Sequence, residues 1–472
     1  MNDLGERLRL IFVGGVRIQN ACVGLWLSQE LRCHVSTRKQ ITLNTSSIRS
    51  STAIMVTVEN LGTNLVGAYG NAITPTPHID RFAAKALIAD QFWMDGCSAA
   101  TVLTSMWTGF HASHPARRSS TDSAKPPDGI IQSPGLLVTD SPEALRLGKS
   151  LLTGDAILAS PPEPHQTAFS SLAAQAFEHW IARMDTLPWL WIHSRGLDGP
   201  WDAPYEYRCA MCGEGDPLPP NETSPPRAQL KPGSDPDILF GWACGAGGQA
   251  MAIDEVWEWL ESALQQLEIA PQCLVALAGV LGYPLGEHGI VGCEPNMHSE
   301  LLHAPCILRP GESLPLGIRF APFLQPHHLG HLLNAWIEYD GWQCADGTSN
   351  KQGLDPLRIE ELSAMASLRR EAWPGRHRGA LATYEHRSTL LVPGWSAVWD
   401  DHDPNAIAGA QAGLFAMPDD RWQQNEIGSR APDVLQRMRQ IRDEWLANSD
   451  QSPSNAEDLL SRMDESLWRP HR

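Results

Sequence analysis

Residues 53–58 constrain the fold of this chain more than any other segment. Their sequence, AIMVTV, combines small and β-branched residues with no charge, which is typical of a strand buried on both faces of a parallel sheet. Similar apolar runs occur at Leu187–His193, Leu274–Gly279 and Cys306–Leu308. Helical patterns separate these runs, so we expect an α/β fold with a mostly parallel, doubly wound sheet, in which the first three strands lie side by side.

Three segments have the apolar spacing of amphipathic helices, at residues 78–88, 169–184 and 250–267. Two regions between them, 115–166 and 214–237, are rich in loop-forming residues. We predict both as loops, the first with one strand at Gly135–Thr139.

The pattern changes after about residue 376. Short apolar runs separated by turn residues follow, and then an apolar stripe from Val434 to Leu446 begins after Pro432. This predicts a small C-terminal antiparallel sheet with a helix at 432–447. The expected division is an N-terminal extension at 1–52, an α/β domain at 53–375, a C-terminal subdomain at 376–448 and a polar tail at 449–472.

The extension at 1–52 contains no clear signal peptide, because Arg17 and Gln19 interrupt its apolar run. Its second half is basic and polar, so we expect it to be poorly ordered and the natural protein to begin at Met55, inside the first strand. No run of 18 apolar residues predicts a membrane span. The ten scattered cysteines suit a reduced compartment, so a cytoplasmic location is expected.

Charge narrows the class of partner. The net charge is −18 and the isoelectric point about 5.4. Nucleic acids and anionic membranes need a basic surface, so neither is expected as the main partner. The expected partner is therefore an unknown protein or a small molecule.

Residues 53–109 resemble the start of the sulfatases, in the alkaline phosphatase superfamily. In that family an apolar strand ends in two aspartates, and the motifs G-x-Y-G, T-P-x-x-D-x-(F/L)-A and C-x-P-S-R-x-x-x-x-T-G follow. This chain keeps the frame of those motifs at Gly67, Tyr69, Gly70, Thr76, Pro77, Asp80, Phe82, Ala83, Thr108 and Gly109. Segments 196–201, 285–289 and 414–446 resemble later sulfatase motifs in the correct order, so the resemblance covers about residues 53–448.

The resemblance also implies that the catalytic residues are missing. Counted back from Thr108-Gly109, the cysteine nucleophile, the proline and the arginine of the motif fall at Ala99, Thr101 and Leu103. The catalytic histidine of D-P-H-x-P-Y aligns with Asp198, and the lysine of G-K aligns with Cys293.

The metal ligands implied by the resemblance are altered as well. Glu59 and Asn60 stand where the strand would end in two aspartates, and Val280 and Leu281 stand where an aspartate and a histidine would complete the site. A hard cation such as calcium takes six or more oxygen ligands, and the hydrocarbon side chains supply none. No cofactor is therefore expected, and calcium only if the site has been rearranged.

Several residues look reactive in isolation. Cys97 lies two residues before the nucleophile position, where a slipped turn would present it. Ser98 or Thr101 would serve as a hydroxyl nucleophile only with metals present. Glu287 and His288 lie in L-G-E-H-G, which in the family mainly shapes a loop, so a structural role is favoured for both.

Two further clusters have simpler interpretations. Cys209 and Cys212 form a lone C-x-x-C, which without a second pair is weak evidence for zinc. His327, His328 and His331 are interpreted as the solvated start of a helix rather than as a metal site. The run Gly245-Ala-Gly-Gly is too short and badly placed for a phosphate loop.

Two functions follow from these observations. The favoured hypothesis is a catalytically degenerate pseudo-sulfatase with a binding or assembly role. The alternative is a divergent sulfuric or phosphoric ester hydrolase with a rearranged site. They differ in whether several oxygen or nitrogen ligands converge near Glu59.

Overall fold

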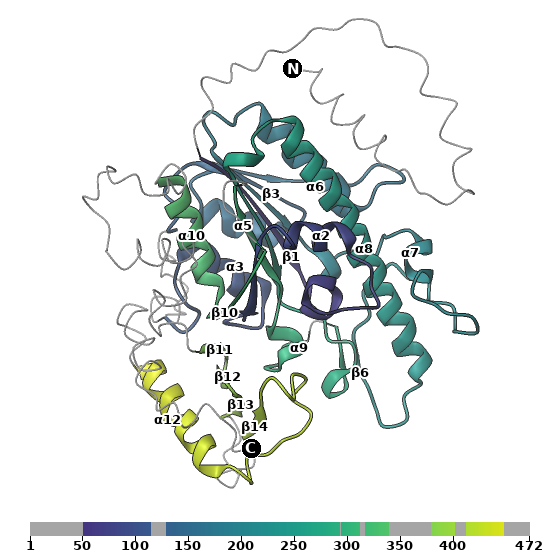
Figure 1. The fold of residues 1–472 in the computed structure, drawn as a ribbon, viewed down its shortest axis with the longest axis vertical. Coiled ribbons are helices and arrows are strands. Elements are labelled where there is room, and N and C mark those ends of the chain that lie inside the picture. The colour runs from purple at the N-terminus through teal and green to yellow at the C-terminus, as the bar shows by residue number, and fades with distance from the viewer. Residues whose placement is uncertain are drawn as a thin grey trace, which may run out of the picture.

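The computed structural model of the chain describes residues 51–114, 129–292, 294–311, 317–338, 379–401 and 412–447. Its main body is an eight-stranded sheet with helices on both faces (Figure 1). The order is β10 (Ile318–Leu324), β2 (Leu87–Phe92), β9 (Cys306–Pro310), β7 (Cys273–Val280), β1 (Thr52–Glu59), β5 (Trp189–Ser194), β3 (Gly135–Thr139) and β4 (Gly154–Leu158). β9 is antiparallel to β2 and β7, and the other pairings are parallel. The expected mostly parallel, doubly wound sheet is confirmed.

Strand β1 lies between β5 and β7. Ala53 pairs with Trp189 and Leu274, and at the other end Val58 pairs with Ser194 and Gly279. The three strands expected to be neighbours are therefore neighbours. Because they are parallel, their carboxyl ends meet at one edge of the sheet, where α/β folds place their ligand sites.

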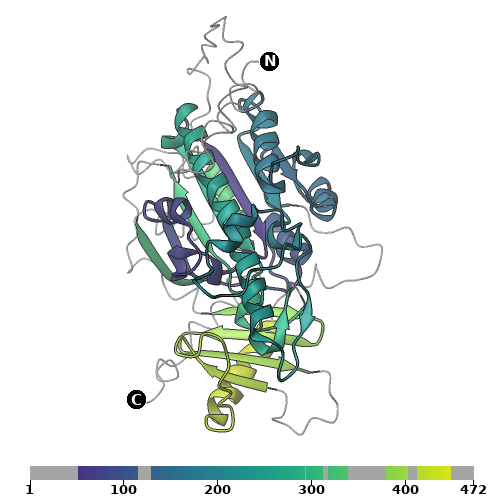
Figure 2. The same cartoon turned by 90° about the vertical axis from the view of Figure 1, so that its right-hand side faces the viewer.

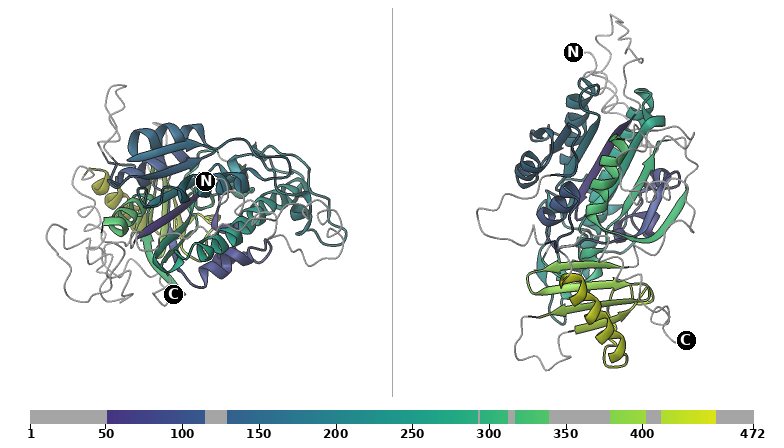
Figure 3. Two further views of the ribbon diagram at one scale, coloured as in Figure 1. Left: turned by 90° about the horizontal axis from the view of Figure 1, so that it is seen from above. Right: turned by 90° about the vertical axis from the view of Figure 1, so that its left-hand side faces the viewer.

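Alternate residues of β1 pack into two separate cores, because successive side chains of a strand point to opposite faces. Ile54, Val56 and Val58 join one core with α2 (Pro77–Ala83), α6 (Ala168–Ile181) and α8 (Pro236–Gln266). Ala53 and Met55 join the other with α3 (Ala99–Thr108), α5 (Pro142–Leu151) and α10 (Pro326–Glu338). Figure 3 shows these two helix layers from above and from the side.

A second sheet lies beyond the edge of the first (Figure 2). It is antiparallel, in the order β11 (Ala380–Tyr384), β12 (Arg387–Val392), β13 (Trp395–Asp400) and β14 (Ala412–Ala416). Helix α12 (Pro432–Ala447) packs Met438, Ile441 and Trp445 onto it. The predicted C-terminal antiparallel sheet and closing helix are confirmed.

Shorter elements connect these layers. They are η2 (Thr63–Leu65), η3 (Gly67–Tyr69), η4 (Gly196–Asp198), α7 (Tyr205–Cys209), η5 (Ala270–Gln272), η6 (Glu287–Gly289), α9 (Ser299–Leu302) and the small ribbon of β6 (Ala228–Gln229) with β8 (Ile290–Val291). Among the residues that the structure describes, no helix is long and apolar enough to cross a membrane.

Three sequence predictions were wrong in extent. The helix expected at 78–88 ends at Ala83, and β2 follows it, because the Ala-Asp-Gln interior of that strand hid its apolar ends. The region 115–166 contains α5 and β4 within its described part, and the Ser141 hydroxyl caps α5. Helix α8 begins at Pro236, well before residue 250, although its first half carries four glycines.

The expected start at Met55 remains a prediction, but its cost to strand β1 is larger than expected. Residues 1–50 lie outside the described residues. Strand β1 begins at Thr52, and Thr52, Ala53 and Ile54 all pair with β7. A chain beginning at Met55 would lose three paired residues, not only the apolar side chain of Ile54.

The retained motif frame has a structural explanation. Gly67 N donates to Thr76 Oγ1 at 2.8 Å, and that hydroxyl donates to Asp80 at 3.2 Å. A Cβ at position 67 would lie 2.3 Å from the Asp80 carboxylate, so only glycine fits there. Gly70 has φ +96°, a left-handed conformation that glycine adopts without strain.

Tyr69 ties this turn to two strands. Its hydroxyl lies 3.0 Å from Ala89 O in β2 and 2.9 Å from Cys306 O in β9, and it accepts from Cys306 N at 2.8 Å. The residues of the motif frame therefore hold the turn on the sheet. This is a structural role that does not depend on catalysis.

We predict that Tyr69→Phe lowers the free energy of unfolding by about 1–3 kcal/mol, because the buried Cys306 N–H loses its acceptor. Urea denaturation followed by fluorescence measures this. Tyr205→Phe is the control, since the Tyr205 hydroxyl only donates to Pro219 O in a half-buried position, and a smaller loss is expected. Equal losses for the two variants would contradict this role of Tyr69.

Candidate functional site

The carboxyl ends of β1, β5 and β7 bring together four of the positions singled out in the sequence. Glu59 pairs with Val280, and Asn60 N donates to Val280 O at 2.9 Å. The Asn60 side-chain amide donates to Gly282 O at 2.7 Å, just beyond Leu281. Val280 is fully buried and Leu281 is 4 % exposed. Hydrocarbon therefore fills the edge where the resemblance places two metal ligands.

The backbone at this edge is unusual. Asn60 has φ +60° and Leu281 has φ +70°, both left-handed. Asparagine tolerates that region, whereas for leucine it costs about 1–2 kcal/mol. Residues held in such conformations cluster at functional sites of folded proteins.

Glu59 is bound by a histidine that we did not single out in the sequence. His193 Nε2 lies 2.9 Å from Glu59 Oε1, and His193 Nδ1 lies 3.0 Å from Thr57 Oγ1. Trp191 Nε1 donates to the same hydroxyl at 2.9 Å. His193 is fully buried and Glu59 is 7 % exposed. The carboxylate thus belongs to a closed hydrogen-bonded chain that starts inside the sheet.

These residues do not fit a calcium ion. Calcium takes six to eight oxygens. One oxygen of Glu59 is engaged by His193, the Asn60 amide is engaged by Gly282, and Val280 and Leu281 offer no side-chain oxygen. Within the described residues, no group of three or more His, Cys, Asp or Glu side chains is arranged to hold a metal.

The position that the resemblance assigns to the cysteine nucleophile, Ala99, lies at the start of α3. Ala99 is the first residue of the helix and packs against the core that contains Val280 and Leu281. Ser98 caps the helix by accepting from Thr101 N at 3.2 Å, and its hydroxyl donates to Thr101 Oγ1 at 2.8 Å. Leu103 is fully buried. The two hydroxyls serve the helix start.

Cys97 is buried in the same core, with 5 % of its surface exposed. Its thiol donates to Asn296 O at 3.2 Å and lies 3.1 Å from Met297 Sδ. Burial raises the pKa of the Cys97 thiol to about 12. Because the thiolate is the nucleophile, this environment suppresses its reactivity.

Asp198 lies in η4, which packs closely on β1: a Cβ at Gly196 would meet Glu59 O at 2.4 Å. The Asp198 carboxylate is turned toward a loop, where Arg227 Nη2 lies 2.5 Å away. This ion pair is partly exposed, so it is worth little in stability. Cys293 lies outside the described residues.

A small cleft opens beside these strand ends. Asp140, Ser194, Asp202 and Gln249 line it, and its volume is about 20 Å³. That is room for about one water. Asp140 accepts from Arg195 N at 2.7 Å, and burial raises the pKa of its carboxyl.

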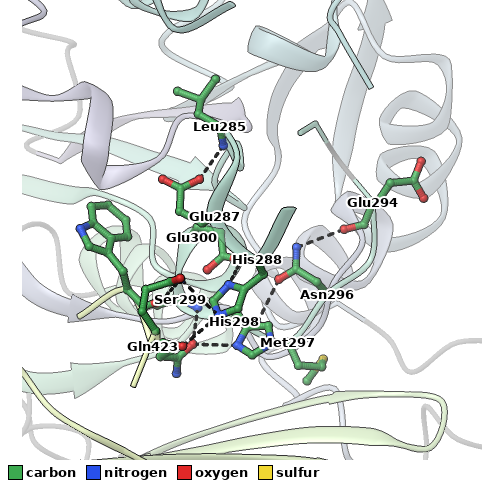
Figure 4. Close-up of polar contacts among 12 residues, drawn as sticks. Leu285, Glu287, His288, Glu294, Asn296, Met297, His298, Ser299, Glu300 and Gln423 are labelled. Carbon is green, nitrogen blue, oxygen red and sulfur yellow. Dashed lines mark hydrogen bonds and ion pairs between the residues drawn. The ribbon is translucent and has the colours of Figure 1, made fainter. Parts of the chain in front are cut away.

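His288 belongs to a polar network that joins the two sheets (Figure 4). Its Nδ1 lies 3.0 Å from Glu300 Oε1, and its Nε2 lies 2.9 Å from Gln423 O in the C-terminal subdomain. The His298 ring stacks on it with centroids 3.8 Å apart. Gln423 in turn accepts from Ser299 N at 2.9 Å. His288 therefore connects the main domain to the subdomain.

The electrostatics of this network follow from burial and charge. Burial opposes protonation of His288, but the hydrogen bonds to Glu300 and Gln423 O outweigh it and raise the pKa of His288 above its usual value. Burial, followed by the charge of His288, lowers the pKa of His298. Both ring nitrogens of His288 face acceptors, so the doubly protonated ring fits best.

The structure also shows the surroundings of the Cys209–Cys212 pair and of His327. Cys209 is the last residue of α7 and Cys212 follows it, and no group of three or more His, Cys, Asp or Glu side chains in the described part of the chain is arranged to hold a metal. The expectation that His327 marks a solvated helix start was wrong. His327 is 4 % exposed, in the first turn of α10, because that helix packs on α3.

Several solved structures share this fold. BT4656, in complex with its substrate D-glucosamine-2-N,6-O-disulfate, has a TM-score of 0.62 at 11 % identity, over 86 % of this chain and 99 % of that one. BT1596, a 2-O GAG sulfatase, has a TM-score of 0.60 at 13 % sequence identity, and the match covers 89 % of this chain and 98 % of that one. The phosphonate monoester hydrolase of Agrobacterium radiobacter has a TM-score of 0.58 at 12 % sequence identity, and the match covers 84 % of this chain and 95 % of that one.

These comparisons show the fold alone, because the identities are low. No family model matches the sequence, and no curated protein matches it. The chain has the fold of the sulfatases and related hydrolases of the alkaline phosphatase superfamily, as its motif frame implied.

Of the two site residues that the sequence analysis did not single out, His193 and Glu300, only His193 carried a usable signal. His193 lies one residue before the end of β5, a buried strand next to β1, and a polar residue at that end of a parallel strand points to the site edge. Glu300 had no such signal, because its short helix α9 has no amphipathic pattern. Its side chain is fully buried, and its Oε2 has no hydrogen-bond partner among the described residues.

We predict that Glu59→Ala lowers the free energy of unfolding by about 3 kcal/mol or more, since it leaves buried His193 without its partner. Glu59→Gln should cost less, because the amide oxygen still accepts from His193 Nε2. Chemical denaturation measures both, with the exposed Glu178→Ala as a control near zero. A stabilised Glu59→Ala would instead be typical of a residue kept for catalysis.

We also predict a pH-dependent contribution from His288. Its pKa is raised on folding, so its stabilisation is complete below the usual value of 6.5 and is lost as pH rises through the folded value. Melting temperatures of the wild type and His288→Gln should therefore converge as the pH rises above 6.5. Glu287, His298 and Glu300 face position 288 in both proteins. A constant difference across this range would contradict the assignment.

Proposed function

We propose that this chain is a sulfatase-fold protein without sulfatase catalysis, and that it acts by binding or assembly. The observation that supports this most strongly is the filling of the site edge. Val280 and Leu281 are buried hydrocarbon at the ends of the strands where a cation would be held, and Glu59 is bound to His193. Val280 and Leu281 offer a sulfate ester neither a positive charge nor a hydrogen-bond donor from their side chains.

The nucleophile side of the pocket supports the same proposal. Ala99 has no reactive group, Thr101 and Ser98 bond to each other, and the Cys97 thiol is buried with its pKa at about 12. Nucleophilic catalysis needs an activated group with a base or metal beside it.

A divergent sulfuric or phosphoric ester hydrolase is the competing proposal. It requires Cys97 or Glu59 to leave its present partners and calcium to be held by a rearranged set of ligands. The fold of known hydrolases favours it in general terms, but fold alone does not determine activity.

We predict that the purified protein hydrolyses neither 4-nitrophenyl sulfate nor 4-nitrophenyl phosphate above the rate of Cys97→Ser, with or without added calcium. Calorimetry should detect no tight calcium binding. Ala99→Cys alone should not restore activity, because Leu103, Val280 and Leu281 are unchanged and residues that act as a unit do not contribute independently. Turnover abolished by Cys97→Ser or Glu59→Gln would establish the hydrolase instead.

The assembly role has its own test. Protein isolated from its natural source should elute in size-exclusion chromatography well above the 51.8 kDa of a single chain. Elution as a single chain without a bound small molecule by native mass spectrometry would contradict it.

A further inference from the structure

Two cysteines outside the site lie side by side where the segment after η4 packs on α8. Cys212 Sγ and Cys244 Sγ are 4.0 Å apart, from positions 32 residues apart in the sequence. Cys212 is half-buried and follows α7, whereas Cys244 is 2 % exposed in α8. Most other described cysteines, such as Cys97, Cys273 and Cys306, are buried in the cores.

The close approach of the two segments is built into the sequence. A Cβ at Gly245 would lie 2.3 Å from the Trp201 ring, one at Gly247 would lie 2.3 Å from Met211 Sδ, and one at Gly248 would lie 3.0 Å from Arg208 Cγ. The glycines that resembled a short phosphate loop therefore form a groove along α8. That groove holds the chain around Cys212 against the helix.

We propose that Cys212 and Cys244 are a redox modification site, which a small-molecule disulfide such as oxidised glutathione converts reversibly to an intramolecular disulfide. A disulfide needs its sulfurs about 2.05 Å apart, so side-chain rotation must shorten the present separation. Reversible disulfides of this kind occur in otherwise reduced proteins as redox sensors. The inference does not depend on whether the site above is catalytic.

The order of the two steps follows from burial. The Cys212 thiolate attacks one sulfur of glutathione disulfide, forms a mixed disulfide and releases one glutathione thiolate, which takes up the Cys212 proton. The Cys244 sulfur then attacks the Cys212 sulfur and releases the second glutathione, which takes up the Cys244 proton. Burial raises the pKa of the Cys244 thiol to about 12, so Cys212 is the residue that reacts first.

The disulfide would close residues 213–243 into a covalent loop beside the altered pocket. Several hydrogen bonds and an ion pair already bind this loop to the main domain, and three of them lie near η4 or the strand ends. Thr223 O accepts from Trp201 N at 2.6 Å, Pro226 O accepts from the Tyr283 hydroxyl at 2.5 Å, and Arg227 pairs with Asp198. Oxidation would add a covalent link between the two ends of this segment, which the present packing already holds close together.

The test uses the purified full-length chain in glutathione buffers of increasing oxidised fraction. Free thiols are trapped with N-ethylmaleimide, and tryptic peptides are mapped without reduction. We expect a peptide pair that joins Cys212 to Cys244, reversed by dithiothreitol. Trypsin cleavage at Arg227 should leave two fragments that separate only after reduction. Closure of the loop should raise Tm by about 5 °C.

Three single variants provide the controls. Cys209→Ser should still form the Cys212–Cys244 link, whereas Cys212→Ser should not. Cys244→Ser should retain a glutathione adduct on Cys212, because no second thiol displaces it. A Cys209–Cys212 link, free alkylation of both thiols in the most oxidising buffer, or stoichiometric zinc released from the untreated protein would each overturn the proposal.

Discussion

Strand β1 lies between two parallel neighbours and between two helix layers, so every side chain it carries must be compatible with burial. From Ala53 to Val58 the strand meets this requirement, because every residue except Thr57 is apolar. Glu59 meets it only because His193, Thr57 and Trp191 form a hydrogen-bonded chain behind it. A buried carboxylate without such partners would be very costly. The charge of the Glu59 carboxylate is therefore balanced by partners within the protein.

The motif frame survives because it serves packing. Gly67, Thr76 and Asp80 bond to one another, and Tyr69 bonds to β2 and β9. These contacts hold the turn and the neighbouring strands together and involve none of the positions that the resemblance assigns to catalysis. The motif frame can therefore be explained by packing alone.

The sequence predicted the elements that carry a strong periodic pattern. The strands at 53–58 and 274–279, the pairing of their ends and the C-terminal sheet follow from apolar runs and turn residues. It did not predict β2, whose polar centre lies near the edge of the sheet, or the first half of α8, where glycines are used for close packing. Of the site, it predicted that Glu59, Asn60, Val280 and Leu281 meet. The partners His193 and Glu300 come from other elements, and their contacts depend on tertiary packing that no local pattern records.

The backbone at the pocket has kept a shape that its present side chains do not require. Leu281 holds φ +70° although its side chain makes only apolar contacts. Gly279 N donates to Pro305 O at 2.8 Å and Gly282 N donates to Leu301 O at 2.7 Å, so bonds on either side hold the turn in place. A Cβ at Gly282 would lie 2.2 Å from Glu300 O, so only glycine fits at that position. Glu300 in turn binds His288, and His288 binds the C-terminal subdomain. The strained turn is therefore maintained by the docking of the two sheets, and the shape of the pocket edge is a property of the whole fold rather than of the residues that line it.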